Sequence, residues 1–397
     1  MKLDLTTAEF PARTNREEKL ARTFARVEQR LGDAHATLLG YPYNLSFSQD
    51  LPQSLHGYLI NNLGDPYAGS YHGSEVYDEE RQAMAWLMRL WGCLDLDQFW
   101  GAIGASGTEG NLWGLYLGRE MLPPDAVLLY GADAHYSVPK AARILRIPAQ
   151  KVASLPNGEM DMADFAAQLQ ALSGRPVIAA LTCGTTMTGA HDDIAAALLA
   201  LQSAGYGRDA RYVHVDGALN AMVLPFLQNV PTAIQPSFEK DIDSLSTCGH
   251  KMIGTPMPCG ALVARKTHIA RIKKAVCDQR SHDTTLMGSR DGHAVLAIWA
   301  RFFGHGYGRF AHDALRCVDR AKQLAADLAA LGVPVLYNPF SLTVVFPEPS
   351  DGMVRRYQLA SKDGQARAIV MPSVTEGLLE QFLVDYATWW RERGRLI

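Results

Sequence analysis

Cysteine is scarce in this sequence, and none of the cysteines forms a CxxC pair with another. This spacing argues against a zinc site or a disulfide framework and favours free thiols in a reducing compartment. The six cysteines are Cys93, Cys183, Cys248, Cys259, Cys277 and Cys317. Long apolar runs are also lacking, since none approaches the ~20 residues of a membrane span. Residues 1–19 contain no apolar centre of a signal peptide, so we expect a cytoplasmic protein.

An excess of charge is lacking as well, because 38 Lys and Arg stand against 41 Asp and Glu. The resulting net charge of −3 gives no reason to expect nucleic acid or an anionic membrane as a partner. The chain has 397 residues, of which 48% are hydrophobic and 20% charged. It therefore has the composition of an ordinary globular protein and enough length for one or two sizeable cores.

The first part of the chain predicts helices that are joined by loops. Residues 16–31 have the spacing of an amphipathic helix that Gly32 would end, and residues 78–91 predict a second helix. The apolar face of the first helix would consist of Leu20, Phe24, Val27 and Leu31. The stretches 39–47 and 60–66 contain proline and are more typical of extended or turning segments.

From about residue 100, short apolar runs alternate with helical stretches such as 162–172 and 194–204. Strands separated by helices indicate βαβ units, and therefore an α/β fold with a mainly parallel sheet that helices cover on both faces. The predicted strands are Ala126–Tyr130, Val177–Thr182, Tyr212–Val215, Ser244–Thr247 and Ala261–Ala264. Ligands bind such sheets at the carboxyl ends of the strands, so the residues that follow each strand are candidates for function.

The composition after residue 300 favours a helix that ends at Gly332, followed by two strands and a closing helix at 341–346, 367–371 and 375–390. This pattern is typical of a second, smaller α/β unit. The predicted parts of the chain are an N-terminal segment, a large domain and a small C-terminal α/β domain, at residues 1–55, 56–300 and 301–397.

Lys251 stands in an unusual setting for a lysine, in the small-residue stretch STCGHKMIG between two apolar runs. A lysine held in such a turn can lose its proton near neutral pH and attack a carbonyl carbon, which is the start of Schiff-base chemistry. A lysine that merely ends a strand explains this segment equally well. The rest of the chain must therefore decide between these two interpretations.

Two other segments carry groups that suit a phosphorylated, aromatic ligand. GASGTEGNLWG, residues 104–114, is a glycine-rich turn into a helix that begins near Thr108, where free backbone amides and a hydroxyl favour a phosphate. The turn has neither Walker nor dinucleotide-binding spacing. Asp216 ends an apolar strand, and it either caps the next helix or pairs with a ring nitrogen that it keeps protonated.

His135 also follows a predicted strand and could lie flat over an aromatic ligand, although a lone histidine is more often structural. Thr185 and Thr186 offer hydroxyls after the next strand. We expect no metal, because no second His/Cys cluster has the spacing to complete a site at His191, Asp192 and Asp193.

One ligand, pyridoxal phosphate, would use all of these groups at the strand ends. Its phosphate would sit on the glycine-rich turn, its aldehyde would join Lys251, and its ring nitrogen would face Asp216. A protonated ring nitrogen makes the ring an electron sink for a carbanion at the substrate α-carbon. We therefore predict pyridoxal 5'-phosphate as the cofactor.

With these motifs the chain resembles the pyridoxal-phosphate-dependent group II amino-acid decarboxylases, and among them the bacterial histidine decarboxylases and the plant serine decarboxylases. The resemblance covers nearly the whole chain and is carried by LGYPYNL, INNLGDP, GTEGNL, HYSVPKAAR, GTTMTGAHDD, HVDGAL, GHKMIG, PMPCG, GSRDGH and VMPSVT. It implies fold type I, which is the aspartate-aminotransferase-like fold. It also implies a homodimer with the active site at the subunit interface and the N-terminal segment packed on the partner.

By position, the resemblance makes Lys251 the Schiff-base lysine, Asp216 the partner of the pyridine nitrogen and His135 the ring that stacks on the cofactor. The cofactor-binding residues that go with them are Gly107, Thr108, Thr185, Ala218, Ser246 and His250. We expect the walls of the substrate pocket to come from the loops at 41–45 and 62–66. The predicted substrate-binding residues are Tyr43, Asn62 and Asp65.

The segment 277–292 resembles the mobile flap of this family. The sequence also departs from the family pattern at two positions of the predicted site. The aromatic amino-acid decarboxylases protonate the carbanion with a flap tyrosine, which this segment lacks, so His282 is the candidate acid. Cys248 stands where related enzymes have a serine. Because a thiol is a poor hydrogen-bond donor, we expect it to hold the phosphate less tightly.

The predicted reaction is the loss of CO2 from a small polar L-amino acid, with L-histidine as the first candidate and L-serine as the second. SHDTT, residues 281–285, is more like the histidine enzymes, whereas LGYPYNL and INNLGDP are more like the serine enzymes. A fold type I aminotransferase or aldolase would use the same lysine and aspartate, but it would usually need an arginine for the α-carboxylate. A binding module that has kept the fold without activity is a further alternative.

Overall fold

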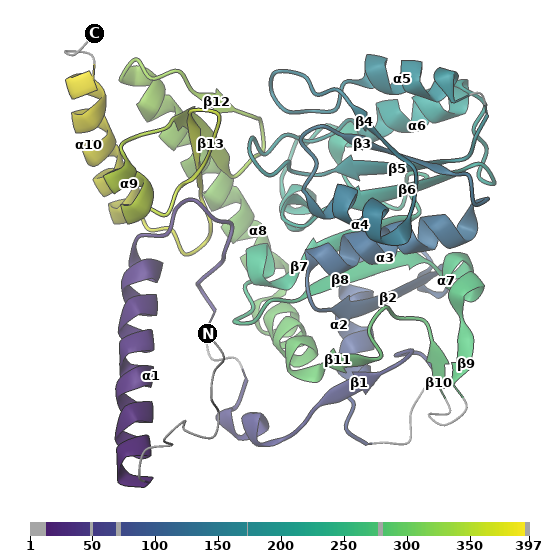
Figure 1. The fold of residues 1–397 in the computed structure, drawn as a ribbon, viewed down its shortest axis with the longest axis horizontal. Helices are drawn as coiled ribbons and strands as arrows, with labels where there is room; N and C mark the ends of the chain where they lie inside the picture. Colours follow the sequence, from purple (N-terminus) through teal and green to yellow (C-terminus); the bar gives the residue numbers. More distant parts are fainter. Residues whose placement is uncertain (1–12, 48–50, 69–72, 173, 277–280, 394–397) are drawn as a thin grey trace, which may run out of the picture.

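The computed structural model describes residues 13–47, 51–68, 73–172, 174–276 and 281–393. A seven-stranded sheet forms the centre of the larger part of the molecule, in the order β2-β8-β7-β6-β5-β3-β4 (Figure 1). Its strands are β2 (Phe99–Gly104), β3 (Val127–Gly131), β4 (Ala149–Val152), β5 (Val177–Thr182), β6 (Arg211–Asp216), β7 (Ser244–Cys248) and β8 (Gly260–Arg265). The strands from β7 to β4 are parallel, and β8 runs antiparallel to both of its neighbours.

The reversed strand β8 has a consequence for the functional edge of the sheet. Since β2 is antiparallel to β8, it points the same way as the parallel strands, and its carboxyl end lies at the same edge. Gly104 of β2 and Cys248 of β7 accordingly both pair with Gly260 of β8. Five of the seven strands match the sequence prediction, whereas β2 and β4 were not predicted. The edge strand β4 has a mostly exposed, polar sequence, which carries little strand signal.

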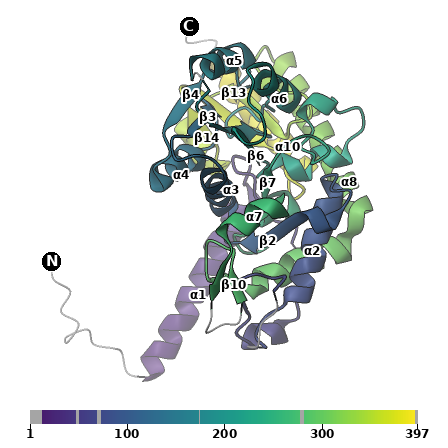
Figure 2. The ribbon, with the colours of Figure 1, turned by 90° about the vertical axis from the view of Figure 1, so that its right-hand side faces the viewer.

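Helices cover both faces of this sheet, which confirms the predicted fold class (Figure 2). One face packs against α3 (Gly107–Met121), α4 (Ser137–Leu145) and α7 (Lys266–Ile272). The other packs against α2 (Tyr77–Leu90), α5 (Met162–Ala171), α6 (Ile194–Ser203) and the first part of α8 (Gly292–Ala330). Alternate residues of β5 enter the two cores, so the whole strand is buried and reads as one continuous apolar run.

A small antiparallel sheet forms the C-terminal part, in the order β12-β13-β15-β14. Its elements are β12 (Leu336–Tyr337), β13 (Thr343–Pro347), α9 (Asp351–Arg356), β14 (Ala360–Lys362), β15 (Gln365–Ile369) and α10 (Glu376–Arg393). The long helix α8 connects the two parts, and Gly332, with φ of +77°, follows its end as predicted. The domain boundary predicted at residue 300 falls inside α8, and it stays a prediction.

The N-terminal helix α1 (Arg13–Ala36) extends away from the rest of the molecule (Figures 1 and 2). It continues past Gly32, so the predicted helix end was wrong; nothing lies within 4 Å of the position of a Cβ there. The predicted apolar face is exposed in the single chain, with Leu20 54%, Phe24 66% and Leu31 45% accessible. Within the described residues, no helix combines the length and apolarity that crossing a bilayer requires.

Two short antiparallel pairs lie beside the main sheet. The first joins β1 (Asn61–Leu63) to β11 (Ser289–Asp291), and the second joins β9 (Lys274–Val276) to β10 (Ser281–Asp283). Residues 277–280 of the predicted flap, including Cys277, lie outside the described residues. Short helical turns occur at Gln53–Gly57, Leu96–Gln98, Asn220–Met222, Leu224–Phe226, Thr232–Ile234 and Gly249–Ile253.

Candidate active site

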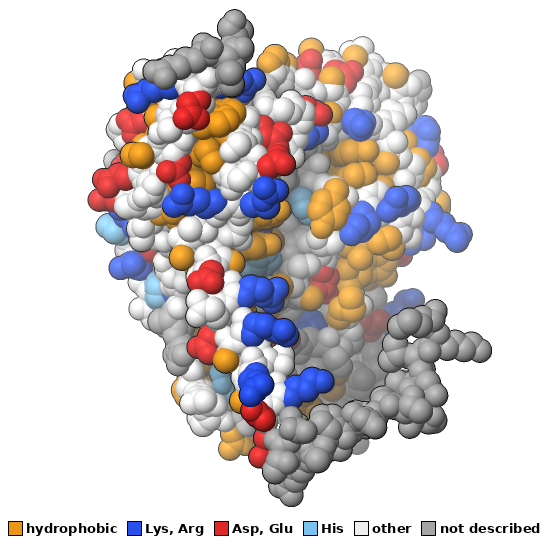
Figure 3. Space-filling model, turned by 60° about the vertical axis from the view of Figure 1, so that its left-hand side comes forward, with side chains coloured by type: hydrophobic (Ala, Val, Ile, Leu, Met, Phe, Trp, Pro, Cys, Tyr) orange, Lys and Arg blue, Asp and Glu red, His pale blue; other side chains and the backbone are white. Residues whose placement is uncertain are grey.

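A cavity of about 370 Å³ opens at the edge of the main sheet where its parallel strands end. The surface is hollowed between the two parts of the molecule, and histidine side chains are visible inside (Figure 3). Segments that follow β2, β3, β5, β6 and β7 line the cavity, together with loop residues 41–43 and strand β15 of the small part. The predicted site residues that line it are Tyr43, Gly107, Thr108, His135, Thr185, Asp216, Ala218, His250 and Lys251.

Lys251 lies in the short turn Gly249–Ile253, directly after β7. Glycines fix this turn at both ends. A Cβ on Gly249 would lie 2.3 Å from Cys259 Sγ, and Gly254 adopts a φ of +83° while its N–H donates to the Gly249 carbonyl at 2.8 Å. The local sequence therefore holds the half-buried lysine at the cavity wall.

Asp216 is the last residue of β6, and its two carboxylate oxygens each accept a hydrogen bond. Oδ1 accepts from the Ala218 backbone N–H at 3.1 Å, and Oδ2 accepts from Asn111 Nδ2 at 2.6 Å. Both oxygens therefore act as hydrogen-bond acceptors. The next short helix, Asn220–Met222, has no side-chain cap, so Asp216 does not act as a helix cap. Its charge is available to a cationic ring nitrogen.

The first turn of α3 also lines the cavity. Ser106 caps the helix by accepting the Glu109 N–H at 3.3 Å, which leaves the amides of Gly107 and Thr108 without helical partners. A Cβ on Gly107 would lie 2.4 Å from Cys248 Sγ, so only glycine leaves this approach to the helix start open. A helix N-terminus with a hydroxyl beside it suits a phosphate group. Together with Lys251 and Asp216, this cradle fits pyridoxal phosphate.

Two histidines of the cavity are held neutral by their surroundings. Burial lowers the pKa of His135, and the cations Lys251, Lys140 and Arg367 lower it further, against the opposing effect of Asp216. Burial, followed by the charge of Lys251, also lowers the pKa of His250. Both imidazoles are therefore uncharged at neutral pH and can act as hydrogen-bond partners.

Sequence reasoning missed two residues of the site, Asn111 and Arg367. Asn111 lies one helical turn after Gly107, on the same side of α3, and this i, i+4 spacing was the available signal. Arg367 reaches the cavity from β15 and is only 6% exposed, and burial lowers its pKa. In the sequence, Arg367 stands out only as the single charged residue within the apolar stretch ARAIVM.

Ser246, which was predicted to bind the cofactor, does not line the cavity described above. It is fully buried in β7, and its hydroxyl donates to Asn111 Oδ1 at 3.0 Å. Ser246 therefore supports Asn111, which in turn contacts Asp216.

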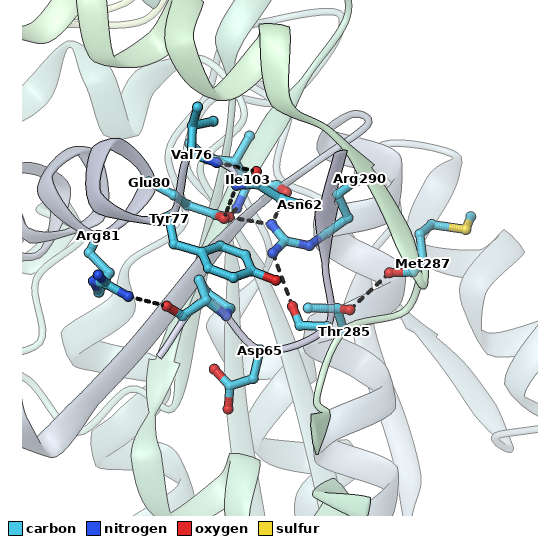
Figure 4. Close-up of polar contacts among 12 residues, drawn as sticks. Asn62, Asp65, Val76, Tyr77, Glu80, Arg81, Ile103, Thr285, Met287 and Arg290 are labelled. Atoms are coloured by element: carbon cyan, nitrogen blue, oxygen red, sulfur yellow. Dashed lines mark hydrogen bonds and ion pairs between the residues drawn. The ribbon is translucent and has the colours of Figure 1, made fainter. Parts of the chain in front are cut away.

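The predicted substrate residues Asn62 and Asp65 lie in a buried cluster away from the cavity (Figure 4). Asn62 Nδ2 donates to Glu80 at 2.7 Å and its Oδ1 accepts from the Val76 N–H at 2.9 Å. Asp65 Oδ1 accepts from Trp100 Nε1 at 3.1 Å. As substrate-binding residues, both stay predictions.

His282, the predicted acid, lies in β10 and also does not line the cavity of its own chain. Its carbonyl accepts the Asp65 N–H at 3.1 Å, and its Nδ1 is buried without a partner among the described residues. No group of three potential metal ligands occurs in the described part of the chain.

Comparison with known proteins gives matches over most of the chain. The model of the pyridoxal-dependent decarboxylase conserved domain matches residues 118–332. Serine decarboxylase 1 of Oryza sativa subsp. japonica is 39% identical over 382 residues, which cover 95% of this chain and 78% of that protein. Histidine decarboxylase of Pseudomonas fluorescens is 38% identical over 356 residues, which cover 87% of this chain and 86% of the relative.

A solved structure of L-methionine decarboxylase from Streptomyces sp.590 superposes with a TM-score of 0.84. The match covers 94% of this chain and 95% of that one at 24% sequence identity. At this identity the likeness concerns the fold alone, and it agrees with the predicted fold type I.

Proposed function

This chain belongs to the pyridoxal-dependent decarboxylases, and from that membership we propose that it removes CO2 from L-histidine to give histamine. Pyridoxal-phosphate-dependent decarboxylation of an amino acid follows from the family itself. The main support for the proposal is that one cavity, at one edge of the sheet, is lined by Lys251, Asp216 and His135.

We assign the cofactor to groups that line the cavity. The Lys251 amine would hold its aldehyde, the ionised Asp216 would keep its ring nitrogen protonated, and the first turn of α3 would bind its phosphate through Gly107 and Thr108. Ala218, Thr185 and His250 would complete its surroundings. When bound, pyridoxal phosphate supplies a conjugated, protonated ring that accepts the electron pair left behind by CO2.

The contribution of the chain beyond this is orientation. The bond to the departing carboxylate must stand perpendicular to the cofactor ring, so the carboxylate has to be held from one side. Arg367 and the neutral His135 both line the cavity and suit this purpose. A buried arginine in this position also suits an aminotransferase, so the product distinguishes the two reactions.

Aromatic side chains at the cavity support histidine as the substrate. Tyr41 and Tyr43 stack with ring centroids 5.8 Å apart, and both line the cavity. A flat imidazole can pack against such rings. L-Serine, which would give ethanolamine, is the second candidate, because the match to the rice serine decarboxylase extends over 95% of this chain.

We also propose that the active unit is a homodimer. The apolar face of α1 is exposed in the single chain, and exposed apolar patches of this kind usually mark an interaction surface. In addition, the predicted residues Asn62, Asp65 and His282 do not line the cavity of their own chain. Asn62 and Asp65 are held by hydrogen bonds inside their own chain, but supply of His282 from a second copy would account for the distance of the acid from the cavity.

The test is a screen of the common L-amino acids for release of CO2 and of the matching amine. We expect L-histidine to give the highest rate, Lys251→Ala to abolish turnover with the fold retained, and Asp216→Ala to slow turnover severely. Lys266→Ala, an exposed lysine of α7, is the matched control and should keep its activity. Keto acid in place of amine, or normal turnover by Lys251→Ala, would contradict the proposal.

A further inference from the structure

A hydrogen-bonded network lies behind the cavity, and its centre is the side chain of Asn111 on α3. Asn111 Nδ2 donates to Asp216 Oδ2 at 2.6 Å and to Ser137 Oγ at 2.8 Å. Its Oδ1 accepts from Ser246 Oγ and pairs with His214 Nε2, each at 3.0 Å. The amide is 1% exposed and uses all of its donors and both of its lone pairs.

The chemistry of Asp216 fixes the orientation of this amide. An ionised carboxylate only accepts hydrogen bonds, so the nitrogen of Asn111 must face Asp216 and the oxygen must face His214. His214 therefore donates from Nε2, and its Nδ1 accepts from the Ser244 hydroxyl at 2.8 Å. Burial lowers the pKa of His214 to about 4, which agrees with a neutral ring.

The space for His214 is provided by α3 itself. A Cβ on Gly114 would lie 2.2 Å from His214 Nδ1, so any larger residue there would displace the ring. The network is therefore built into the packing of α3 against β6 and β7.

The other branch of the network reaches His135 through Ser137. Because Ser137 Oγ already accepts a hydrogen bond from Asn111 Nδ2, its own hydroxyl can donate to His135 Nδ1, at 2.7 Å. The Ser137 backbone N–H points at the same nitrogen, at 3.3 Å. Two donors directed at Nδ1 leave no room for a proton on it, so the ring proton belongs on Nε2.

We propose that Asn111 and Ser137 are positioning residues that hold His135 as the neutral tautomer with its proton on Nε2, while the same amide fixes Asp216. This inference rests on the proposed function, because Nε2 is the nitrogen left for a substrate in the cavity. The charged groups that act on His135 are Asp216 of β6, Lys140 of α4, Arg367 of β15 and Lys251.

A neutral donor has an advantage over an imidazolium at this position. The carboxylate loses its negative charge as CO2 departs, so a second cation beside Arg367 would stabilise the ground state more than the transition state. A neutral Nε2–H can orient the carboxylate and release it as its charge disappears. The Asn111 network therefore gives His135 orientation without charge.

The test is ¹⁵N NMR of the holoenzyme carrying ¹⁵N-labelled histidine rings, with the His135 signals assigned by their loss in His135→Gln. We expect a protonated Nε2 and an unprotonated Nδ1 at neutral pH. Ser137→Ala leaves only the longer backbone contact at Nδ1, so it should give a mixture of the two tautomers and lower kcat/KM about fivefold, roughly the loss of one hydrogen bond. Ser137→Thr, which keeps the hydroxyl, should restore both properties.

Ser237→Ala, which removes a hydroxyl far from the cavity, is the control and should leave the His135 signals unchanged. A proton on Nδ1 or a charged ring in the unsubstituted enzyme would overturn the inference, and so would an unchanged tautomer in Ser137→Ala. The spectrum does not depend on turnover. A correct tautomer without CO2 release would therefore count against the proposed function alone, and CO2 release with the wrong tautomer against this inference alone.

Discussion

Cys248 brings a thiol into the phosphate end of the cavity, in contact with the first residue of α3. A Cβ on Gly107 would lie 2.4 Å from this sulfur, and burial raises the pKa of the thiol, so it stays uncharged. Because sulfur is a weak hydrogen-bond partner, the cradle holds a phosphate less firmly than a hydroxyl would allow. We expect Cys248→Ser to lower the dissociation constant of pyridoxal phosphate by roughly five- to tenfold, as measured by spectroscopic titration.

The control for this prediction is another buried thiol. Cys317→Ser, on α8 and away from the cavity, should leave cofactor affinity unchanged. Equal or weaker binding by Cys248→Ser would mean that the thiol does not limit the phosphate site.

At the scale of single residues, the sequence pointed to the groups that follow strands. Lys251, Asp216 and His135 could be found because parallel strands bring their carboxyl ends to one edge. Asn111 and Arg367 could not be assigned in this way, since one lies inside a helix and the other reaches the cavity from a different sheet.

At the scale of elements, a buried ion pair ties β11 to α2 (Figure 4). The Arg290 guanidinium contacts Glu80, and it also donates to the carbonyls of Ile103 at 2.9 Å and Gly64 at 3.1 Å. Both charged side chains are at most 1% exposed. We expect Glu80→Gln to lower the free energy of unfolding by about 3 to 5 kcal/mol, measured by urea denaturation, because it leaves a buried guanidinium without its counter-charge.

An exposed ion pair provides the comparison. Glu18 and Arg22 of α1 are 58% and 78% exposed, so Glu18→Gln should change the free energy of unfolding by less than about 1 kcal/mol. Similar values for both variants would show that the Glu80 pair does not anchor β11.

At the scale of the whole molecule, α1 is a helix whose apolar face has no cover in the single chain. Phe24 and its neighbours on this face would be buried if a second copy packed against them. If the proposed homodimer forms through this face, Phe24→Asp should shift the protein from dimer to monomer in sedimentation velocity and reduce turnover.

Leu199→Asp, at an exposed apolar residue of α6, should leave the dimer intact and serves as the control. A mixed dimer adds a functional readout. If His282 acts on the partner's cavity, co-expression of a Lys251→Ala chain with a His282→Gln chain should restore one working site per mixed dimer. A monomeric unsubstituted protein, or mixed dimers without recovered activity, would count against this arrangement.

Alternating strands and helices dictate a parallel sheet and its reactive edge, so the fold class and the main chemical groups can be inferred from local patterns. The residues that meet at this edge from distant parts of the chain are known only once the chain is folded. Because β8 runs antiparallel to its neighbours, the carboxyl end of β2 and the start of α3 lie at this edge. The small part contributes Arg367. Its guanidinium Nε donates to the Gly40 carbonyl at 3.5 Å, and these two residues are 327 positions apart in sequence. Such meetings depend on register and packing between segments far apart in sequence, and local patterns carry no information about either.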